Sequence, residues 1–225
     1  MYFLFSYCTG EAKDHGSAAD DLFRVSLENC LDHLPFCVRI EPSETRKGRK
    51  DMKHFLIVVD MQKDFVDGAL GTPEAQAIVG KVMDKILGFE GQVFATLDTH
   101  RENYLDTAEG QKLPVPHCIK GTPGWALNDA VAAALEQKGY TPVEKLTFGS
   151  VLLPRLLYQA AAGEDFTVEL VGLCTDICVV SNALMLKANF PEMEIAVDST
   201  CCAGVTPETH EAALNTMGCC QINLR

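Results

Sequence analysis

The chain has few basic residues, with 19 Lys and Arg against 31 Asp and Glu and a formal net charge of −12. An acidic protein without a basic cluster is repelled by phosphate backbones and by anionic lipid surfaces. No apolar run approaches the roughly 20 residues that a membrane span needs. The composition therefore disfavours both nucleic acid and membranes as partners.

Signals for export are also missing. The apolar opening, MYFLFSYC, is too short for a signal core, has no positive leading region and precedes no small-residue cleavage site. The ten cysteines accompany 47% hydrophobic residues, enough for an ordinary core, so we interpret them as thiols rather than as a disulfide framework. We therefore expect a cytoplasmic protein.

The first 51 residues lack a clear hydrophobic pattern and end in a charged linker, PSETRKGRKD. We interpret residues 1–51 as an N-terminal extension, in which residues 20–34 could form a short amphipathic helix. Residues 52–225 are long enough for one folded domain. Met52 is followed at once by an apolar run, so it is a candidate for the true start of the protein.

From Met52 onward, short strand-like runs alternate with helical patterns, which is typical of repeated βαβ units and a parallel sheet. The predicted strands are 55–60, 92–98, 142–145, 167–173, 194–199 and 220–224. The predicted helices are 73–87, 125–138, 150–162, 175–188 and 207–217. The longest gap, residues 99–124, is too long for a passive connector and is a candidate functional loop. No glycine-rich phosphate loop follows the first strand, which disfavours nucleotide binding.

Ligands of open α/β sheets bind beyond the carboxyl ends of the strands, so the residues found there are the first candidates for chemistry. Asp60 ends the first predicted strand, Lys145 ends the third, and Cys178 follows the fourth. Asp60 follows an apolar run and needs a partner, which Lys145 could supply while also stabilising a thiolate. The alternative is a purely structural ion pair. Asp64, in the following loop, is interpreted as an ordinary exposed residue or a helix cap.

Cys178 is favoured over the other cysteines by its place near a predicted helix start. Thr175 and Asp176 are credible as a cap and first turn, so unpaired N–H groups and the helix dipole would favour the thiolate of Cys178. The alternative is a buried, inert thiol, which is what most cysteines are. The adjacent pairs 201–202 and 219–220 point to opposite faces of an extended chain and are interpreted as core residues.

The loop after the second predicted strand contains a cluster of potential metal ligands. Its imidazoles and carboxylates are donors that Zn²⁺ accepts, and they are Asp98, His100, Glu109 and His117. Glu102 and Asp106 are competing carboxylates. The alternative is that the two histidines are ordinary surface residues.

Five motifs in order, VVDMQKDF, DTH, PHCIKGTPGW, EKLTFGS and VGLCTDICV, resemble those of the isochorismatase-like cysteine hydrolases, and among them the nicotinamidases. The resemblance runs from Met52 to the C-terminus. It implies a doubly wound, three-layer α/β/α sheet of about six mainly parallel strands and a catalytic triad of Asp60, Lys145 and Cys178. It also implies a cis peptide before Cys174, and an oxyanion hole formed by the N–H groups of Cys174 and Cys178.

The resemblance further implies a divalent metal, Zn²⁺ or alternatively Fe²⁺ or Mn²⁺, held by Asp98, His100 and His117. Tyr104 stands where nicotinamidases have a middle histidine, and Glu109 matches a glutamate that some members use instead.

The implied reaction is hydrolysis of nicotinamide to nicotinate and ammonia through a Cys178 thioester, with Phe65 and Trp125 as aromatic walls of the pocket. The expected partner is a small-molecule amide. A homo-oligomer is possible, and the sequence does not decide the oligomeric state. Alternatives are a related hydrolase acting on another amide, a carbamoyl amine or a vinyl ether, and a non-catalytic binding module.

Overall fold

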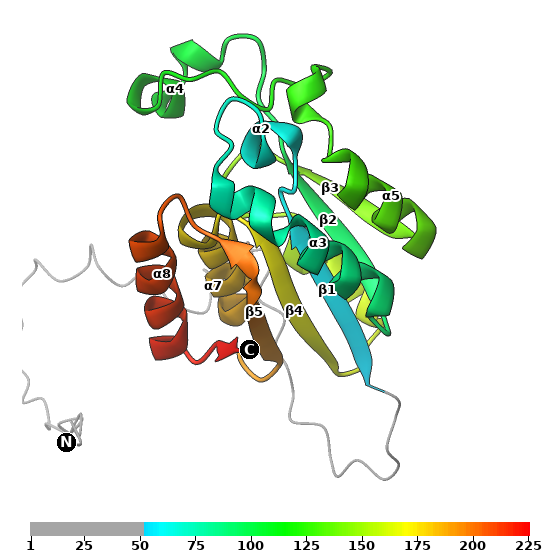
Figure 1. Cartoon of the computed structure of the whole chain (residues 1–225). Helices are drawn as coiled ribbons and strands as arrows, with labels where there is room; N and C mark the ends of the chain where they lie inside the picture. The colour runs from blue at the N-terminus through cyan, green and yellow to red at the C-terminus, as the bar shows by residue number, and fades with distance from the viewer. Residues whose placement is uncertain (1–51) are drawn as a thin grey trace, which may run out of the picture. The chain divides into compact units, whose positions relative to one another are not determined.

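The computed structural model describes residues 52–225, so the predictions made for residues 1–51 lie outside the described residues. A single sheet of six strands, all paired in parallel, forms the centre of the fold (Figure 1). The strands are β1 (Lys53–Val59), β2 (Gln92–Asp98), β3 (Tyr140–Lys145), β4 (Phe166–Leu173), β5 (Glu194–Ala203) and β6 (Asn223–Leu224). The doubly wound α/β fold class that the sequence predicts is confirmed.

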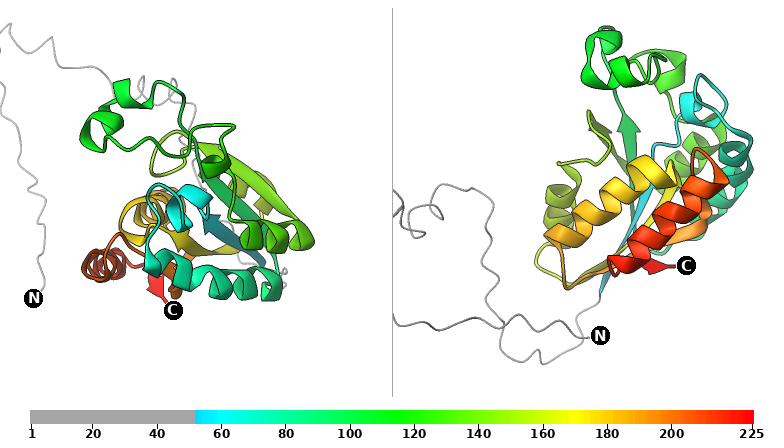
Figure 2. Two further views of the ribbon diagram at one scale, coloured as in Figure 1. Left: turned by 45° about the horizontal axis from the view of Figure 1, so that its top comes forward. Right: turned by 90° about the vertical axis from the view of Figure 1, so that its left-hand side faces the viewer.

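Helices cover both faces of the sheet. The longer helices are α3 (Pro73–Gly88), α5 (Asp129–Lys138), α6 (Leu153–Ala161), α7 (Val180–Asn189) and α8 (Pro207–Cys219). Helices α3 and α5 share one hydrophobic core with the sheet, and α6, α7 and α8 share the other. The views in Figure 2 show α7 and α8 side by side on their face.

The two cores explain why the first strand reads as a continuous apolar run. Side chains alternate between the faces of a strand, so Phe55 and Ile57 belong to the core under α6 to α8, whereas Leu56 and Val58 belong to the core under α3 and α5. A strand buried on both faces needs an apolar side chain at every position.

The strand order β3-β2-β1-β4-β5-β6 places a switch point between β1 and β4. The chain builds outward from β1 to β3 and then returns to β4 on the other side of β1, which opens a crevice at the carboxyl ends of these strands. Gly172 lies opposite Val59 in this pairing, with a φ of 115°. A side chain at Gly172 would collide with the carbonyl oxygen of Val59, so glycine is required for this close approach.

The long loop between β2 and α5 contains more structure than the sequence predicts. Its short helical segments are η1 (Tyr104–Asp106), α4 (Ala108–Lys112) and η2 (Pro123–Trp125), and the turn after β1 contains α2 (Lys63–Val66). These segments are too short to show hydrophobic periodicity, which explains why pattern analysis misses them. Together they rise above the carboxyl edge of the sheet (Figure 1).

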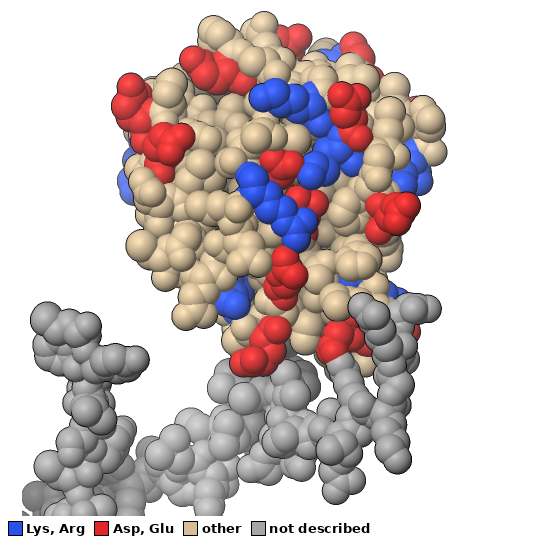
Figure 3. Space-filling view, turned by 60° about the horizontal axis from the view of Figure 1, so that its bottom comes forward, with Lys and Arg blue, Asp and Glu red and all other residues tan. Residues whose placement is uncertain are grey.

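Several charged side chains in the described residues form ion pairs. Lys85 Nζ lies 2.7 Å from Oδ2 of Asp198, and Arg225 donates a 2.8 Å hydrogen bond to Glu194. On the face that Figure 3 presents, basic residues lie beside acidic ones rather than in a patch of their own. None of the helices within residues 52–225 combines the length and the apolar character that crossing a membrane requires.

Candidate active site

Asp60 lies at the switch point, directly after β1, and is fully buried. Its backbone has a left-handed conformation, with a φ of 48°, which aspartate tolerates better than most residues. The hydroxyl of Thr96, on the neighbouring strand, donates a 2.7 Å hydrogen bond to Oδ1 of Asp60. The Asp60 carboxylate is therefore held by strand-end contacts rather than by solvent.

Lys145, the last residue of β3, brings the predicted triad together. Its Nζ lies 2.7 Å from Oδ2 of Asp60 and 3.4 Å from Sγ of Cys178. Burial by itself lowers the pKa of Lys145, but the neighbouring acidic groups, the carboxylates of Asp60 and Asp98 above all, outweigh it and raise the pKa. Lys145 is therefore an ammonium ion that balances the charge of the acids around it.

Cys178 and Asp60 share an environment that opposes negative charge on either. Burial raises the pKa of Asp60, although Lys145 and Thr96 act against this effect. Burial and the nearby Asp60 carboxylate raise the pKa of the Cys178 thiol well above its usual value. The sequence-based expectation of a thiolate favoured by a helix start is therefore wrong. This direction favours the thiol form of Cys178, which lies beside Asp60, the group that can accept its proton.

The segment that carries Cys178 also differs from a simple capped helix. The peptide between Leu173 and Cys174 is cis, as the resemblance implies, and the chain then enters a π-helical turn, η3 (Thr175–Val179), before α7 begins. Thr175 and Asp176 do not act as the predicted cap. They lie inside the turn, where the Thr175 hydroxyl pairs with His210 Nδ1 at 2.8 Å and Asp176 accepts from the N–H of Val205.

The four predicted metal ligands converge on one point, and their donor atoms lie within 4.8 Å of one another. His100 Nε2 is 2.9 Å from Oδ2 of Asp98 and 3.7 Å from Oε1 of Glu109. His117 Nε2 is 3.8 Å from the same Asp98 oxygen and 3.9 Å from the same Glu109 oxygen. Donor atoms about 2.0–2.2 Å from a zinc ion lie roughly 3–4 Å apart, so these separations suit a divalent metal.

The protonation pattern of the cluster also fits a cation. His117 Nδ1 lies 2.8 Å from the carbonyl oxygen of Val115, and only an N–H can pair with a carbonyl. In the neutral imidazole Nε2 then carries the lone pair and faces the cluster, which is the tautomer that metal ligation needs. His100 Nε2 is buried and makes no hydrogen bond within residues 52–225. Contacts with His100 and Lys145 outweigh burial and lower the pKa of Asp98, which keeps it a carboxylate.

Tyr104 packs against both histidines, whose rings also contact each other, instead of acting as a ligand. Its buried ring lies edge-on to His100 and His117, with centroids 4.6 and 5.0 Å away. Its hydroxyl donates to the carbonyl of Leu113. Glu109, from helix α4, supplies the fourth donor. Tyr104 thus orients the imidazoles at the position where the resemblance expects a histidine.

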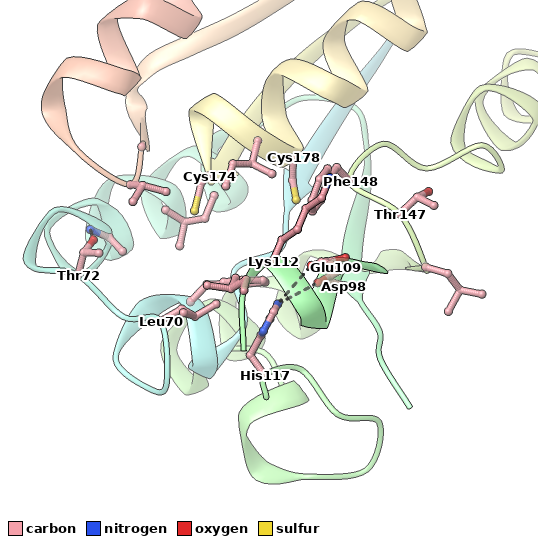
Figure 4. A pocket seen from close by; sticks show the side chains of 18 of the residues that line it. Leu70, Thr72, Asp98, Glu109, Lys112, His117, Thr147, Phe148, Cys174 and Cys178 are labelled. Carbon is pink, nitrogen blue, oxygen red and sulfur yellow. Dashed lines mark hydrogen bonds and ion pairs between the residues drawn. The ribbon is translucent and has the colours of Figure 1, made fainter. Parts of the chain in front are cut away.

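A cavity of about 560 Å³ opens over these groups. In Figure 4, Cys178 and the pair His117 and Glu109 project into it from different sides. Phe65 lines the cavity, as predicted. Trp125, the other predicted wall, is not among the residues that line this cavity, and its Nε1 donates a 2.9 Å hydrogen bond to Thr99 Oγ1.

Sequence reasoning missed three polar residues that position the site. The fully buried Gln62 forms two hydrogen bonds with the backbone of Asp98, donating to its carbonyl at 2.9 Å and accepting from its N–H at 2.7 Å. Asp64, which the sequence predicts to be an ordinary exposed residue or a helix cap, accepts a 2.7 Å hydrogen bond from the N–H of Cys118, next to His117. Asn182 lies behind the nucleophile, and its amide donates to the Cys178 carbonyl. Gln62 and Asp64 come shortly after the end of a buried strand. That position in the sequence is the signal that could have marked them as site residues.

Comparison with known proteins agrees with this geometry. Residues 54–223 match the family model described as "Isochorismatase domain". A relative from Bacillus subtilis (strain 168), the "Uncharacterized isochorismatase family protein PncA", is 30% identical over 181 residues, which cover 73% of this chain and 93% of the relative.

Solved structures resemble the chain as well. The crystal structure of the nicotinamidase/pyrazinamidase PncA from Bacillus subtilis superposes with a TM-score of 0.68 at 26% identity, covering 77% of this chain and 99% of that one. The pyrazinamidase of Pyrococcus horikoshii in complex with zinc gives 0.62 at 26% identity, with 77% and 98% covered. The chain therefore belongs to the isochorismatase-like hydrolase family, on its nicotinamidase branch.

Proposed function

We propose that this hydrolase is a nicotinamidase-type cysteine amidohydrolase, which converts nicotinamide and water to nicotinate and ammonia. The observation that carries the proposal is the single cavity into which both Cys178 and the cluster around His117 project. A small aromatic carboxamide matches this arrangement, because its carboxamide carbon can meet the nucleophile while its ring nitrogen faces the cluster around His117. The names of two structural relatives, a nicotinamidase/pyrazinamidase and a pyrazinamidase, support the same substrate class.

The first half of the reaction is acylation of Cys178. Asp60 accepts the thiol proton while the sulfur attacks the carboxamide carbon. Lys145, 2.7 Å from Asp60, stabilises the negative charge shared by the acid and the sulfur. The N–H groups of Cys174 and Cys178 are the donors for the developing oxyanion. The carbon–nitrogen bond then breaks, and Asp60 returns the proton to the departing ammonia.

The second half is hydrolysis of the thioester. Asp60 removes a proton from water as the water attacks the thioester carbon, and the carbon–sulfur bond breaks. The thiolate regains its proton from Asp60, and the carboxylic acid leaves as nicotinate. The cycle starts from a Cys178 thiol and an ionised Asp60; burial raises the pKa of the thiol, and contacts with Lys145 and Thr96 act to lower the pKa of Asp60 against the effect of burial.

Asp98, His100, Glu109 and His117 would hold the metal, and their two imidazoles and two carboxylates suit Zn²⁺, with Fe²⁺ or Mn²⁺ as alternatives. When bound, such a cation supplies a Lewis acid that holds the pyridine nitrogen and orients the ring. The chain's own contribution is the orientation of the donors through Tyr104 and Gln62. Release of nicotinate would place the enzyme in pyridine nucleotide biosynthesis, as a cytoplasmic step of NAD salvage.

The test is ammonia release from nicotinamide, pyrazinamide and a simple aliphatic amide, with and without a chelator. We expect turnover of the two aromatic amides, loss of activity on metal removal, and loss of at least about a thousandfold in Cys178→Ala. Cys219→Ala, which changes an exposed thiol, is the matched control and should stay active. Turnover of another amide but not of nicotinamide would favour a related amidase, and no turnover of any amide would favour a binding module.

A further inference from the structure

The cavity is much larger than the proposed substrate. A pyridine carboxamide takes up roughly the space of four water molecules, about 120 Å³ at about 30 Å³ each. The cavity measures about 560 Å³. A molecule of nicotinamide that reaches from Cys178 to the metal ligands therefore leaves most of the cavity unfilled.

The cavity extends past the nucleophile on the side of Leu70 and Thr72. In Figure 4, Leu70 and Thr72 lie on the opposite side of the cavity from Thr147 and Phe148, with Cys174 and Cys178 between them. We call this side the α3 arm, because helix α3 and the turn before it form one wall. Its lining residues are Leu70, Thr72, Ala75, Leu173, Gly204 and Val205.

The α3 arm has an apolar surface. Leucine, alanine, glycine and valine offer no polar side-chain atom, and the hydroxyl oxygen of Thr72 already accepts the N–H of Ala75 at 3.0 Å. A ligand group that contacts these residues gains by removing apolar surface from water. The arm therefore suits a hydrocarbon group rather than a carboxylate, a phosphate or a sugar.

The geometry also decides which part of the substrate can extend into the arm. In the proposed reaction the leaving nitrogen takes its proton from Asp60. The floor around that carboxylate is closed, because Asp60 and Thr96 are fully buried and Lys145 is 3% exposed. A substituent on the leaving nitrogen has no room there, so the extension has to belong to the acyl part.

We propose that the site prefers primary carboxamides whose acyl part extends beyond a pyridine ring by an apolar group, seated in the α3 arm. This inference rests on the proposed amidase function and narrows its substrate class. The reaction is unchanged: the acyl carbon exchanges its bond to nitrogen for one to the oxygen of water, and ammonia leaves.

The test compares nicotinamide with quinoline-3-carboxamide, which keeps the ring nitrogen and the carboxamide and adds a fused hydrocarbon ring. Each carbon that becomes buried is worth about a fourfold gain, so we expect a kcat/KM at least tenfold higher for the fused substrate. N-butylnicotinamide carries its hydrocarbon on the leaving nitrogen, and we expect no turnover of it. Equal or poorer turnover of the fused amide, beside normal turnover of nicotinamide, would overturn the inference and leave the proposed function standing.

A variant that fills the arm localises the effect. Val205 is 49% exposed, and Val205→Phe adds bulk without disturbing a core. We expect it to lower the ratio of kcat/KM values, fused amide over nicotinamide, by tenfold or more. Val151→Phe is the matched control, because Val151 is 79% exposed and does not line the cavity, and it should leave the ratio unchanged. An unchanged ratio in Val205→Phe would contradict the assignment of the arm.

If neither amide is hydrolysed, calorimetry can still separate the proposed amidase function from the proposed α3 arm. It measures the affinity of the Cys178→Ala variant for nicotinamide and for quinoline-3-carboxamide. Tighter binding of quinoline-3-carboxamide than of nicotinamide would support the arm while the proposed function fails. Absence of binding by both compounds would overturn the inference together with the function.

Discussion

The ammonium group of Lys145 lies 3.1 Å from Oδ1 of Asp98, and this contact joins the two halves of the site. Lys145 also contacts Asp60 and Cys178, whereas Asp98 also contacts His100. One buried cation therefore compensates carboxylates of both the proposed triad and the proposed metal cluster. Changes in either half are expected to affect the other through this pair.

Replacement of Lys145 by methionine should destabilise the fold strongly. The change leaves the carboxylates of Asp60 and Asp98 buried without their cation, and breaking a buried ion pair in this way costs about 3–5 kcal/mol. Lys120→Met breaks an exposed pair with Glu144 and should cost less than about 1 kcal/mol. Denaturant unfolding of both variants measures the difference. Equal decreases in the free energy of unfolding would contradict the role of Lys145 as the cation that compensates the buried carboxylates.

Replacement of Thr96 by valine should move the acid limb of the kcat/KM profile to higher pH. The proposed mechanism needs Asp60 ionised, so activity falls as the pH drops through the Asp60 pKa. Burial already raises that pKa, and the hydrogen bond from Thr96 acts to lower it. Valine removes this bond, so the pKa rises further. Thr96→Ser keeps the hydroxyl and should keep the wild-type profile; an unshifted limb in the valine variant would count against Asp60 as the base.

Replacement of Glu109 by glutamine should weaken metal binding. Glutamine keeps the size of the side chain but removes the negative charge, and we expect the affinity to fall at least about tenfold. Competition with a chromogenic chelator and elemental analysis provide the measurement. Glu102→Gln is the control, since Glu102 is an exposed carboxylate of the same loop. If both variants retain the metal equally well, Glu109 is not a ligand.

Asn182→Ala should raise KM and lower stability. The Asn182 amide donates to the carbonyls of Cys178 and Phe148 and accepts from the N–H of Ser150, so it ties the nucleophile to the loop that carries Phe148. Its loss leaves buried backbone groups unpaired, at about 1–3 kcal/mol.

Asn189→Ala is the matched control for Asn182. It removes an exposed asparagine of the same helix whose side chain, within residues 52–225, donates to the carbonyl of Met185, so we expect little change in KM or in the free energy of unfolding. A change in stability of Asn182→Ala without any change in KM would reduce Asn182 to a purely structural residue.

Pattern analysis predicted the strands and long helices well because their signals are local. Continuous apolar runs indicate strands buried on both faces, and 3.6-residue periodicity indicates the helices between them. The same regularity placed Asp60, Asp98 and Lys145 at strand ends, and the parallel sheet brings such ends together. The short segments η1, α4 and η2 carry too few residues for periodicity to reveal them.

The sequence by itself determined the parallel sheet, the residues at its carboxyl edge and the family, because strand burial and ordered motifs are written in contiguous residues. Only the tertiary structure decided that burial raises the pKa of the Cys178 thiol, that Glu109 approaches His100 and His117, and that Trp125 does not line the cavity. These features depend on burial and on partners distant in the chain, such as Gln62 with Asp98. No local pattern encodes the environment that such contacts create.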